Sequence, residues 1–142
     1  MEINGLIMRQ LFQLTRTISR SLNSNFSPYN LHFSEWGIIL TLMEKGMMTQ
    51  GELATYLNIE PSAVSRSLVG LQNKGYIMRK AGVDRREKQV FLTELAKNQY
   101  QVWDSIAGQH RQNLLADLSE EKKKELYAVL NDIYQTVQCK DG

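Results

Sequence analysis

The residues of this chain best suited to chemistry are cations gathered in one segment. Residues 61–93 carry seven bases and two acids, a net charge of +5, and no carboxylate occurs between Glu60 and Asp84. The bases are Arg66, Lys74, Arg79, Lys80, Arg85, Arg86 and Lys88. A local positive field attracts polyanions whatever the total charge, and the +2 of the whole chain is therefore a cancellation. A charge run alone is more often a solvated face. This run coincides with a predicted helix and hairpin tip, which favours a partner-facing surface.

Residues for other kinds of chemistry are sparse. We find no paired carboxylates beside a base, no nucleophile motif and no phosphate-cradling glycine loop, and we expect no enzyme and no catalytic residue. His32, His110 and Cys139 show no metal-ligand spacing, so we expect no metal site and no cofactor. His110 is expected to be a partly buried structural histidine, and Cys139 an inert thiol near the chain end.

Two short helices are predicted to position the cations. A capping box at 49–52 starts a helix that runs to about Leu57. After a turn at 58–60, a proline begins a second helix over 61–74, and Gly75 stands where a left-handed cap belongs. This is the spacing of a helix-turn-helix, whose second helix enters the major groove of DNA and presents its N-terminal residues to base edges.

The helix over 61–74 has one apolar side and one polar side. Val64, Leu68 and Leu71 are spaced to face a core, and Val69 falls on the other side. Serine hydroxyls can donate to a phosphate or a base, and an arginine can bind guanine or a phosphate. The expected DNA contacts on this helix are Ser62, Ala63, Ser65, Arg66 and Ser67.

Two short apolar runs, 76–80 and 90–92, flank a polar tip and predict a β-hairpin. The tip, 81–88, would bring cations to a narrow minor groove. Asp84 makes sense there if it pairs with Arg86 and fixes the direction of the guanidinium group. The expected DNA contacts of this tip are Asp84, Arg85, Arg86 and Lys88, and a mobile charged turn is the alternative.

The two ends of the chain are predicted to be helical. Apolar residues step by four, three and four from Ile7 to Ile18, and again from Leu126 to Val137. Between them we expect a helix at 34–45, a long helix after Thr93, and a last helix that starts at Ser119. A monomer could pair the two outer stripes internally, but a C2 dimer would also cover them.

Composition limits where such a protein works. No run approaches the roughly 18 apolar residues of a membrane span, and the first residues lack a secretory signal pattern. The single cysteine forms no internal disulfide. We therefore expect a cytoplasmic protein without a membrane partner.

The segment Asp84-Arg85-Arg86 followed by Leu92-Thr93 resembles the D-x-R…L-T signature of the MarR family of bacterial transcription regulators. Trp36, 52–54, 61–66 and 71–77 also match, so the resemblance covers nearly the whole chain. It implies a mainly α fold with a small β-hairpin wing, a winged helix-turn-helix, in which the N- and C-terminal helices form a homodimer on a pseudo-palindromic operator. The domains expected are 1–32 (dimerisation helix and linker), 33–93 (DNA binding) and 94–142 (dimerisation helices).

Family members are often released from DNA by a small phenolic or other ligand. By the same resemblance, the effector-binding residues here would be Arg16, Tyr29, His32 and Trp36, although core packing explains Trp36 equally well. The leading hypothesis is a homodimeric repressor that a small molecule releases from its operator. The alternative is a winged helix that contacts another protein and binds no DNA, which would need an apolar presented face.

Overall fold

The computed structural model describes residues 2–82 and 87–141, with side chains as far as Cys139. Its helices are α1 (Ile3–Phe26), a 3-10 helix η1 (Ser27–Tyr29), α2 (Phe33–Lys45), α3 (Gln50–Leu57), α4 (Pro61–Asn73), α5 (Glu94–Leu115) and α6 (Glu120–Asp141). Its strands are β1 (Met48–Thr49), β2 (Ile77–Ala81) and β3 (Lys88–Leu92). The chain forms two compact units, Met1–Ile106 and Ala107–Gly142, and each is described here by itself.

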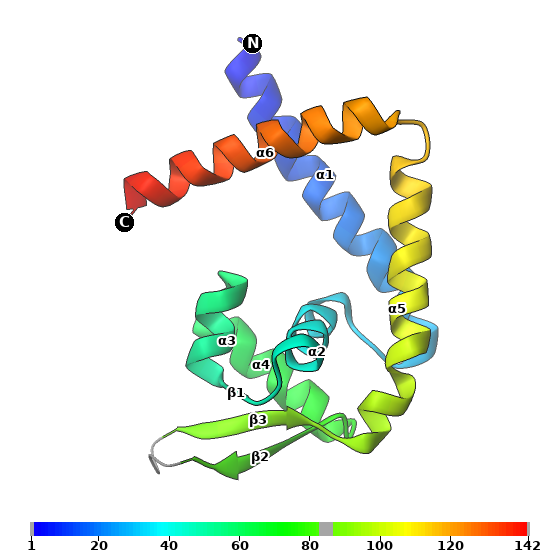
Figure 1. The fold of residues 1–142 in the computed structure, drawn as a ribbon, viewed down its shortest axis with the longest axis vertical. Coiled ribbons are helices and arrows are strands. Elements are labelled where there is room, and N and C mark those ends of the chain that lie inside the picture. Colours follow the sequence, from blue (N-terminus) through cyan, green and yellow to red (C-terminus); the bar gives the residue numbers. More distant parts are fainter. Residues whose placement is uncertain (1, 83–86, 142) are drawn as a thin grey trace. The chain divides into compact units, whose positions relative to one another are not determined.

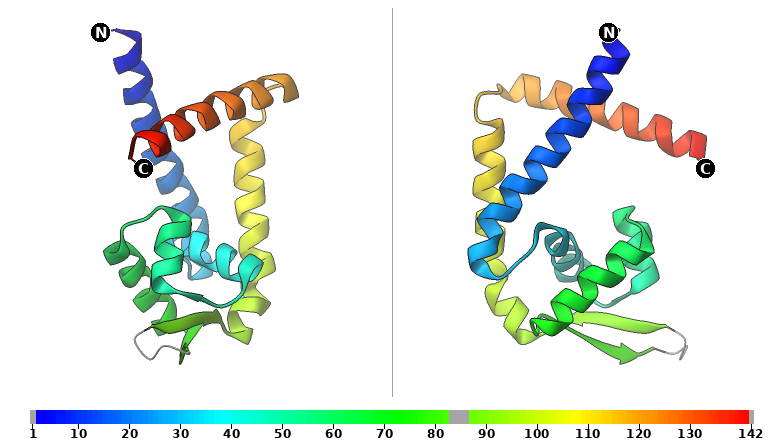
Figure 2. Two further views of the ribbon diagram at one scale, coloured as in Figure 1. Left: turned by 60° about the vertical axis from the view of Figure 1, so that its left-hand side comes forward. Right: turned by 180° about the vertical axis from the view of Figure 1, so that it is seen from behind.

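The first unit contains a helix-turn-helix and a three-stranded antiparallel sheet in the order β1-β3-β2 (Figure 1). Helices α2, α3 and α4 lie on one side of this sheet (Figure 2). The hairpin is in register from Ile77 opposite Leu92 to Ala81 opposite Lys88. The predicted mainly α fold with a small β-hairpin wing is confirmed, and the strands extend one to two residues closer to the tip than predicted.

The core of this unit forms where the apolar sides of α2, α3, α4 and the sheet meet. The side chains of Leu53, Val64, Leu68, Leu71, Ile77 and Val90 are each at most 1% exposed. The apolar side predicted for α4 is therefore confirmed. Removal of this apolar area from water stabilises the fold by about 25 cal/mol per Å², and it fixes the rotation of α4 about its own axis.

The predicted helix starts and stops are confirmed at three places. Thr49 Oγ1 accepts a hydrogen bond from the backbone N–H of Glu52, and Glu52 Oε1 accepts one from the N–H of Thr49, each over 3.1 Å. Ser119 Oγ accepts from the N–H of Lys122 over 3.2 Å. Gly75 has a φ of +81°, the left-handed conformation expected after α4.

Helix α1 continues past its predicted end near Leu22, through Asn23-Ser24-Asn25 to Phe26. The extension places Phe26 in the core, fully buried, with its ring 5.6 Å from that of Trp36. Asn23 Oδ1 also accepts a hydrogen bond from the N–H of Phe33 over 3.1 Å. Burial of an aromatic side chain outweighs the poor helix propensity of three polar residues.

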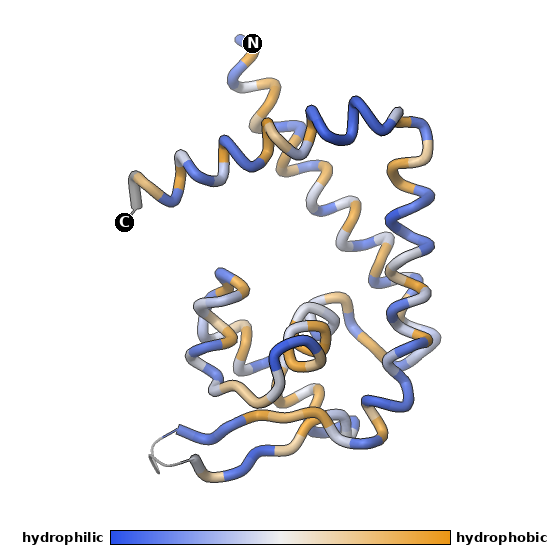
Figure 3. The backbone as a smooth tube through the Cα atoms, viewed as in Figure 1, coloured by the Kyte–Doolittle hydropathy of each residue, from blue (hydrophilic) through white to orange (hydrophobic). Residues whose placement is uncertain are grey.

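The second unit contains the end of α5 and helix α6. Apolar residues recur along α6, as the hydropathy colouring in Figure 3 shows. Leu126, Leu130, Ile133 and Val137, the residues of the predicted stripe, are each 40–52% exposed. The helical period is confirmed, and within the part of the chain described here the stripe stays accessible to solvent.

Candidate nucleic-acid interface

The polar side of α4 is the centre of the candidate interface. Ser62 and Arg66 are exposed, Ala63 and Ser65 are partly exposed, and Val69 is 51% exposed. The turn before α4 depends on Asn58, whose φ of +54° is left-handed and whose N–H donates to Thr55 O over 3.3 Å. Pro61 then occupies the first helical position, where a missing N–H costs nothing.

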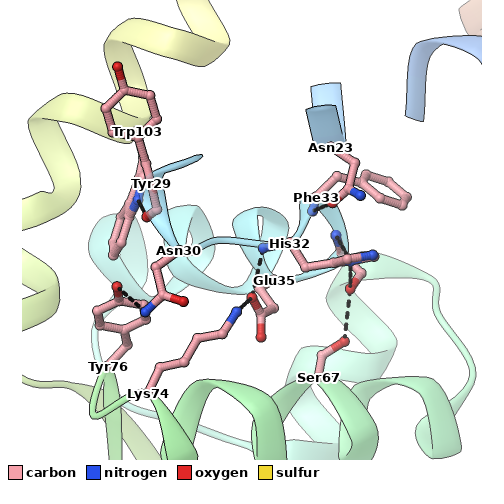
Figure 4. Close-up of polar contacts among 11 residues, drawn as sticks. Asn23, Tyr29, Asn30, His32, Phe33, Glu35, Ser67, Lys74, Tyr76 and Trp103 are labelled. Atoms are coloured by element: carbon pink, nitrogen blue, oxygen red, sulfur yellow. Dashed lines mark hydrogen bonds and ion pairs between the residues drawn. The ribbon is translucent and has the colours of Figure 1, made fainter. Parts of the chain in front are cut away.

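Ser67 differs from its neighbours because its hydroxyl is turned toward α2. Its Oγ donates to Ser34 Oγ over 3.3 Å, and Ser34 Oγ lies 2.8 Å from His32 Nδ1 (Figure 4). His32 also caps α2, since Nδ1 accepts a hydrogen bond from the N–H of Ser34 over 3.2 Å. The structure thus places Ser67 in a contact between helices rather than with Ser62 and Arg66 on the exposed side.

A buried ion pair joins the end of α4 to the start of α2. Lys74 Nζ lies 2.6 Å from Glu35 Oε1, and the Glu35 and Lys74 side chains are 5% and 26% exposed (Figure 4). The same oxygen accepts a hydrogen bond from the N–H of His32 over 2.8 Å and completes the cap of α2. A Cβ at Gly70 would lie 2.7 Å from Glu35 Oε2, so the carboxylate needs a glycine there.

Because of this ion pair, not all of the net charge of +5 in residues 61–93 is accessible to a partner. The charge of Lys74 is matched inside the fold by Glu35, a residue of α2. Arg66, Lys80 and Lys88 are exposed. Arg79 is partly buried, and its Nε has no hydrogen-bond partner among the described residues. The accessible cations thus lie on α4 and on the two strands of the hairpin.

The hairpin is described as far as Gly82 after β2 and again from Glu87 before β3. Lys88 is exposed at the start of β3, and Ala81 of β2 is its register partner. Asp84, Arg85 and Arg86 lie outside the described residues, so their expected DNA contacts and the expected Asp84–Arg86 pair stay predictions. Strand β1 was not expected from the sequence; it pairs Met48 with Val90 at the other edge of β3.

The four expected effector residues have different surroundings. Arg16 is exposed on α1, and Trp36 is 7% exposed, with its ring 5.6 Å from those of Phe26 and Tyr100. Tyr29 is 50% exposed, and its carbonyl accepts a hydrogen bond from Trp103 Nε1 over 3.1 Å. His32 is engaged in the cap of α2. Trp36 therefore belongs to the core, and His32 already serves the helix that follows it.

Sequence reasoning missed Glu35, because a buried acid and an exposed one look the same in a charge count. Two signals were available. The first is that Glu35 is the third residue of α2, the position at which a glutamate closes a capping box. The capping box was hard to recognise, because its first residue is His32, where Ser, Thr, Asp or Asn is usual. The second signal was Gly70, because a glycine inside a helix lowers the stability of that helix relative to alanine.

The expectations about metal ions, membrane spans, Cys139 and His110 can be compared with the part of the chain that the structure describes. No cluster of three or more His, Cys, Asp or Glu residues there could hold a metal ion. None of the helices there combines the length and apolar composition that a bilayer crossing requires. Cys139 is exposed, and His110 is partly buried, as expected for a structural histidine.

The fold and the polar, cationic side of α4 define a winged helix-turn-helix protein of the DNA-binding type. The family model described as "MarR family" matches residues 29–87. The HTH-type transcriptional regulator YwoH of Bacillus subtilis is 34% identical over 122 residues, covering 86% of this chain and 89% of that protein. The HTH-type transcriptional regulator PecS of Dickeya dadantii is 27% identical over 135 residues, covering 90% of this chain and 80% of PecS. The chain belongs to the MarR family of transcriptional regulators.

Solved structures show the same fold. A MarR transcriptional regulator from Methanosarcina mazei Go1 aligns with a TM-score of 0.85 at 22% identity, over 94% of this chain and 97% of that one. A mutant MarR from E. coli, complexed with operator DNA, aligns with a TM-score of 0.84 at 22% identity, over 94% and 99%. The organohalide-sensing regulator RdhR, in a 2,4-dichlorophenol-bound form, aligns with a TM-score of 0.89 at 22% identity, over 96% and 82%.

Proposed function

We propose that this protein is a homodimeric repressor that binds a pseudo-palindromic operator and is released by a small-molecule effector. The observation that carries the proposal is the two-sided character of α4, whose core side is at most 1% exposed at Val64, Leu68 and Leu71. With that side fixed, Ser62, Ser65 and Arg66 are the residues left to read a major groove. Within the described residues no acid interrupts this side, since α4 contains none.

The solved relatives support the two ligands of this proposal. The E. coli MarR mutant was crystallised with operator DNA, and RdhR with 2,4-dichlorophenol. We propose that Ser62, Ala63, Ser65 and Arg66 contact bases or the nearby backbone, and that Arg85, Arg86 and Lys88 reach the DNA from the wing. Contact with chromosomal DNA requires the compartment that holds it, so we also propose a cytoplasmic protein.

Exposed apolar residues on both outer helices support the homodimer. On α1, Ile3, Leu6, Ile7, Met8, Phe12 and Leu14 are each at least 44% exposed. On α6, Leu126, Leu130, Ile133 and Val137 are similarly accessible. Many exposed large apolar residues on one helix favour an interaction site. We propose that 1–32 and 94–142 form the dimer and 33–93 binds DNA, with two copies of α4 about one DNA turn apart, ~34–36 Å.

The test begins with selection of bound duplexes from a pool of genomic fragments, followed by anisotropy titrations at two salt concentrations. Arg66→Ala is expected to weaken binding by about 1–3 kcal/mol and to relax the preference at one base position. Arg86→Ala is expected to weaken binding to all duplexes and to reduce the slope against salt by about one. Arg111→Ala, which removes an exposed arginine from α5, serves as the matched control.

Two results would contradict the proposal. Absence of duplex binding at low salt would exclude the operator-binding function and favour the protein-contact alternative. A monomeric mass by light scattering at micromolar concentration would exclude the homodimer. The accessible serines on α4, Ser62 and Ser65, argue against a protein-contact surface, because such surfaces are apolar at their centre and poor in serine.

A further inference from the structure

One apolar side chain lies among the polar residues of α4 that are proposed to contact DNA. Val69 is 51% exposed, whereas the other large apolar side chains of this helix are at most 1% exposed. Helix propensity does not favour a valine at an exposed position, because its branched Cβ loses rotamer freedom against the preceding turn. About half of the Val69 side chain is therefore available to a partner.

The period of the helix places Val69 with the residues proposed to read DNA. Residues at i, i+3, i+4 and i+7 share one side of an α-helix, and the residues of α4 with this spacing are Ser62, Ser65, Arg66 and Val69. The third helix of a homeodomain reads the major groove with four residues at the same spacing. Val69 comes three residues after Arg66, or about 4.5 Å along the helix axis, and one base-pair step is ~3.4 Å. Val69 would thus face a base pair close to the one that Arg66 contacts.

The major groove offers one group that is complementary to an apolar side chain. The base edges present hydrogen-bond donors and acceptors there, and thymine adds its C5-methyl group. A valine over a donor or an acceptor would leave that group without a partner, whereas contact with the methyl group removes apolar surface of both molecules from water. The restricted χ1 of valine also lowers the entropy lost in such a contact. The chemistry of Val69 therefore favours thymine over the other three bases.

We propose that Val69 is a specificity-determining residue, which contacts the C5-methyl group of a thymine in each half of the operator. This assignment rests on the proposed function, since it requires α4 in a major groove. Ser65 and Arg66 can bind a phosphate as well as a base, but a valine gains nothing from a phosphate. Val69 would therefore contribute to sequence preference and not to the affinity for DNA in general.

Replacement of thymine by uracil tests this contact at the level of one methyl group. The duplex is one selected for binding, and in each copy of it deoxyuridine replaces thymine at one pair of symmetry-related positions. The exchange keeps the hydrogen-bonding groups of the base and removes only the methyl group. At one such position we expect the native chain to lose about two- to fourfold in affinity per half-site, the effect of burying one methyl group.

The assignment to Val69 requires that this loss disappear when the side chain is shortened. Val69→Ala should bind the thymine and uracil duplexes equally, and Val69→Ile, which keeps the branched apolar side chain, should still distinguish them. The slope of affinity against salt should be the same for Val69→Ala and the native chain, because no phosphate contact is lost. Val102→Ala, which shortens a valine of α5 that is 39% exposed, is the matched control and should distinguish the duplexes as the native chain does.

The possible failures of this assignment and of the proposed function give different results. If uracil weakens binding at no position, or if its effect persists undiminished in Val69→Ala, the Val69 assignment is refuted and the repressor function stands. A shallower salt slope in Val69→Ala would mean that the substitution displaces phosphate contacts, and it would also overturn the assignment. Absence of binding to every duplex would refute the proposed function, and the thymine contact with it.

Discussion

Replacement of Lys74 by methionine should destabilise the protein more than neutralisation of its partner. Lys74→Met keeps the apolar stem of the side chain and leaves the Glu35 carboxylate, 95% buried, without its cation. Loss of one partner from a fully buried ion pair costs about 3–5 kcal/mol. Because the Lys74 side chain is 26% exposed, water can reach part of the site, and we expect about 2–4 kcal/mol.

Glu35→Gln should cost much less. A glutamine at the third position of α2 still accepts the capping hydrogen bond from His32 N–H, and its amide oxygen still accepts one from Lys74. Lys74 keeps its charge but is partly hydrated, so we expect a loss of about 1 kcal/mol. The double variant should cost less than the sum of the two, since no buried charge remains once both are replaced.

Urea unfolding followed by circular dichroism at one fixed protein concentration measures these differences. Lys123→Met is the matched control: it removes the exposed pair with Glu120, 3.1 Å long, and should cost less than about 1 kcal/mol. The reasoning is refuted if Lys74→Met costs no more than Lys123→Met, or less than Glu35→Gln. Either result would mean that Lys74 contributes little to the stability of the fold through the carboxylate of Glu35.

Four smaller changes test other contacts of the first compact unit by the same unfolding measurement. Gly70→Ala should destabilise the native chain, because its Cβ would meet Glu35 Oε2 at 2.7 Å, yet stabilise a Glu35→Ala background by about 1 kcal/mol through helix propensity; a stabilising effect in both would contradict the contact. Asn58→Ala should cost about 1–2 kcal/mol for its left-handed φ of +54°, and Asn58→Gly should cost nothing; equal effects would exclude backbone strain. Thr49→Ala should cost about 1 kcal/mol, and Thr49→Ser, which keeps the cap, only a fraction of that. Trp103→Phe should cost about 1–3 kcal/mol by leaving the Tyr29 carbonyl without its indole donor, and a cost below ~0.5 kcal/mol would show that water replaces it.

The helices were predictable because each carries its signals locally. The capping box at Thr49, the proline at 61 and the left-handed Gly75 act within a few residues of themselves, and all three have the expected geometry. The apolar side of α4 followed from spacing alone. The end of α1 did not follow from local signals, because the helical Asn23-Ser24-Asn25 lead to contacts between residues ten apart, Phe26 with Trp36 and Asn23 with Phe33. Local propensity contains no information about such contacts.

The short strand β1 shows a different limit. Met48 and Thr49 are too few to display the alternation of a strand, and Thr49 also caps α3. Their pairing with Val90 and Gln89 is set by the tertiary fold, which brings the start of α3 to the free edge of β3. For the wing, the sequence predicted the strands, whereas Asp84 and the two arginines after it lie outside the described residues.

A count of charges does not distinguish the bases of 61–93 that are paired inside the fold from those that face solvent. Lys74 and Arg66 are equivalent in a count of the bases in 61–93, yet Lys74 is neutralised by Glu35 and Arg66 is exposed. The Lys74 pair, together with Ser67 on Ser34, ties the middle of α4 and the residue just after its end to the first turn of α2. The segment before α2 is held in turn by Asn30 on the Tyr76 hydroxyl and by Trp103 on Tyr29. A displacement of residues 29–35 would therefore have to break these contacts or move α4. Lys74 thus fixes the position of α4, whereas Arg66 on the same helix stays exposed.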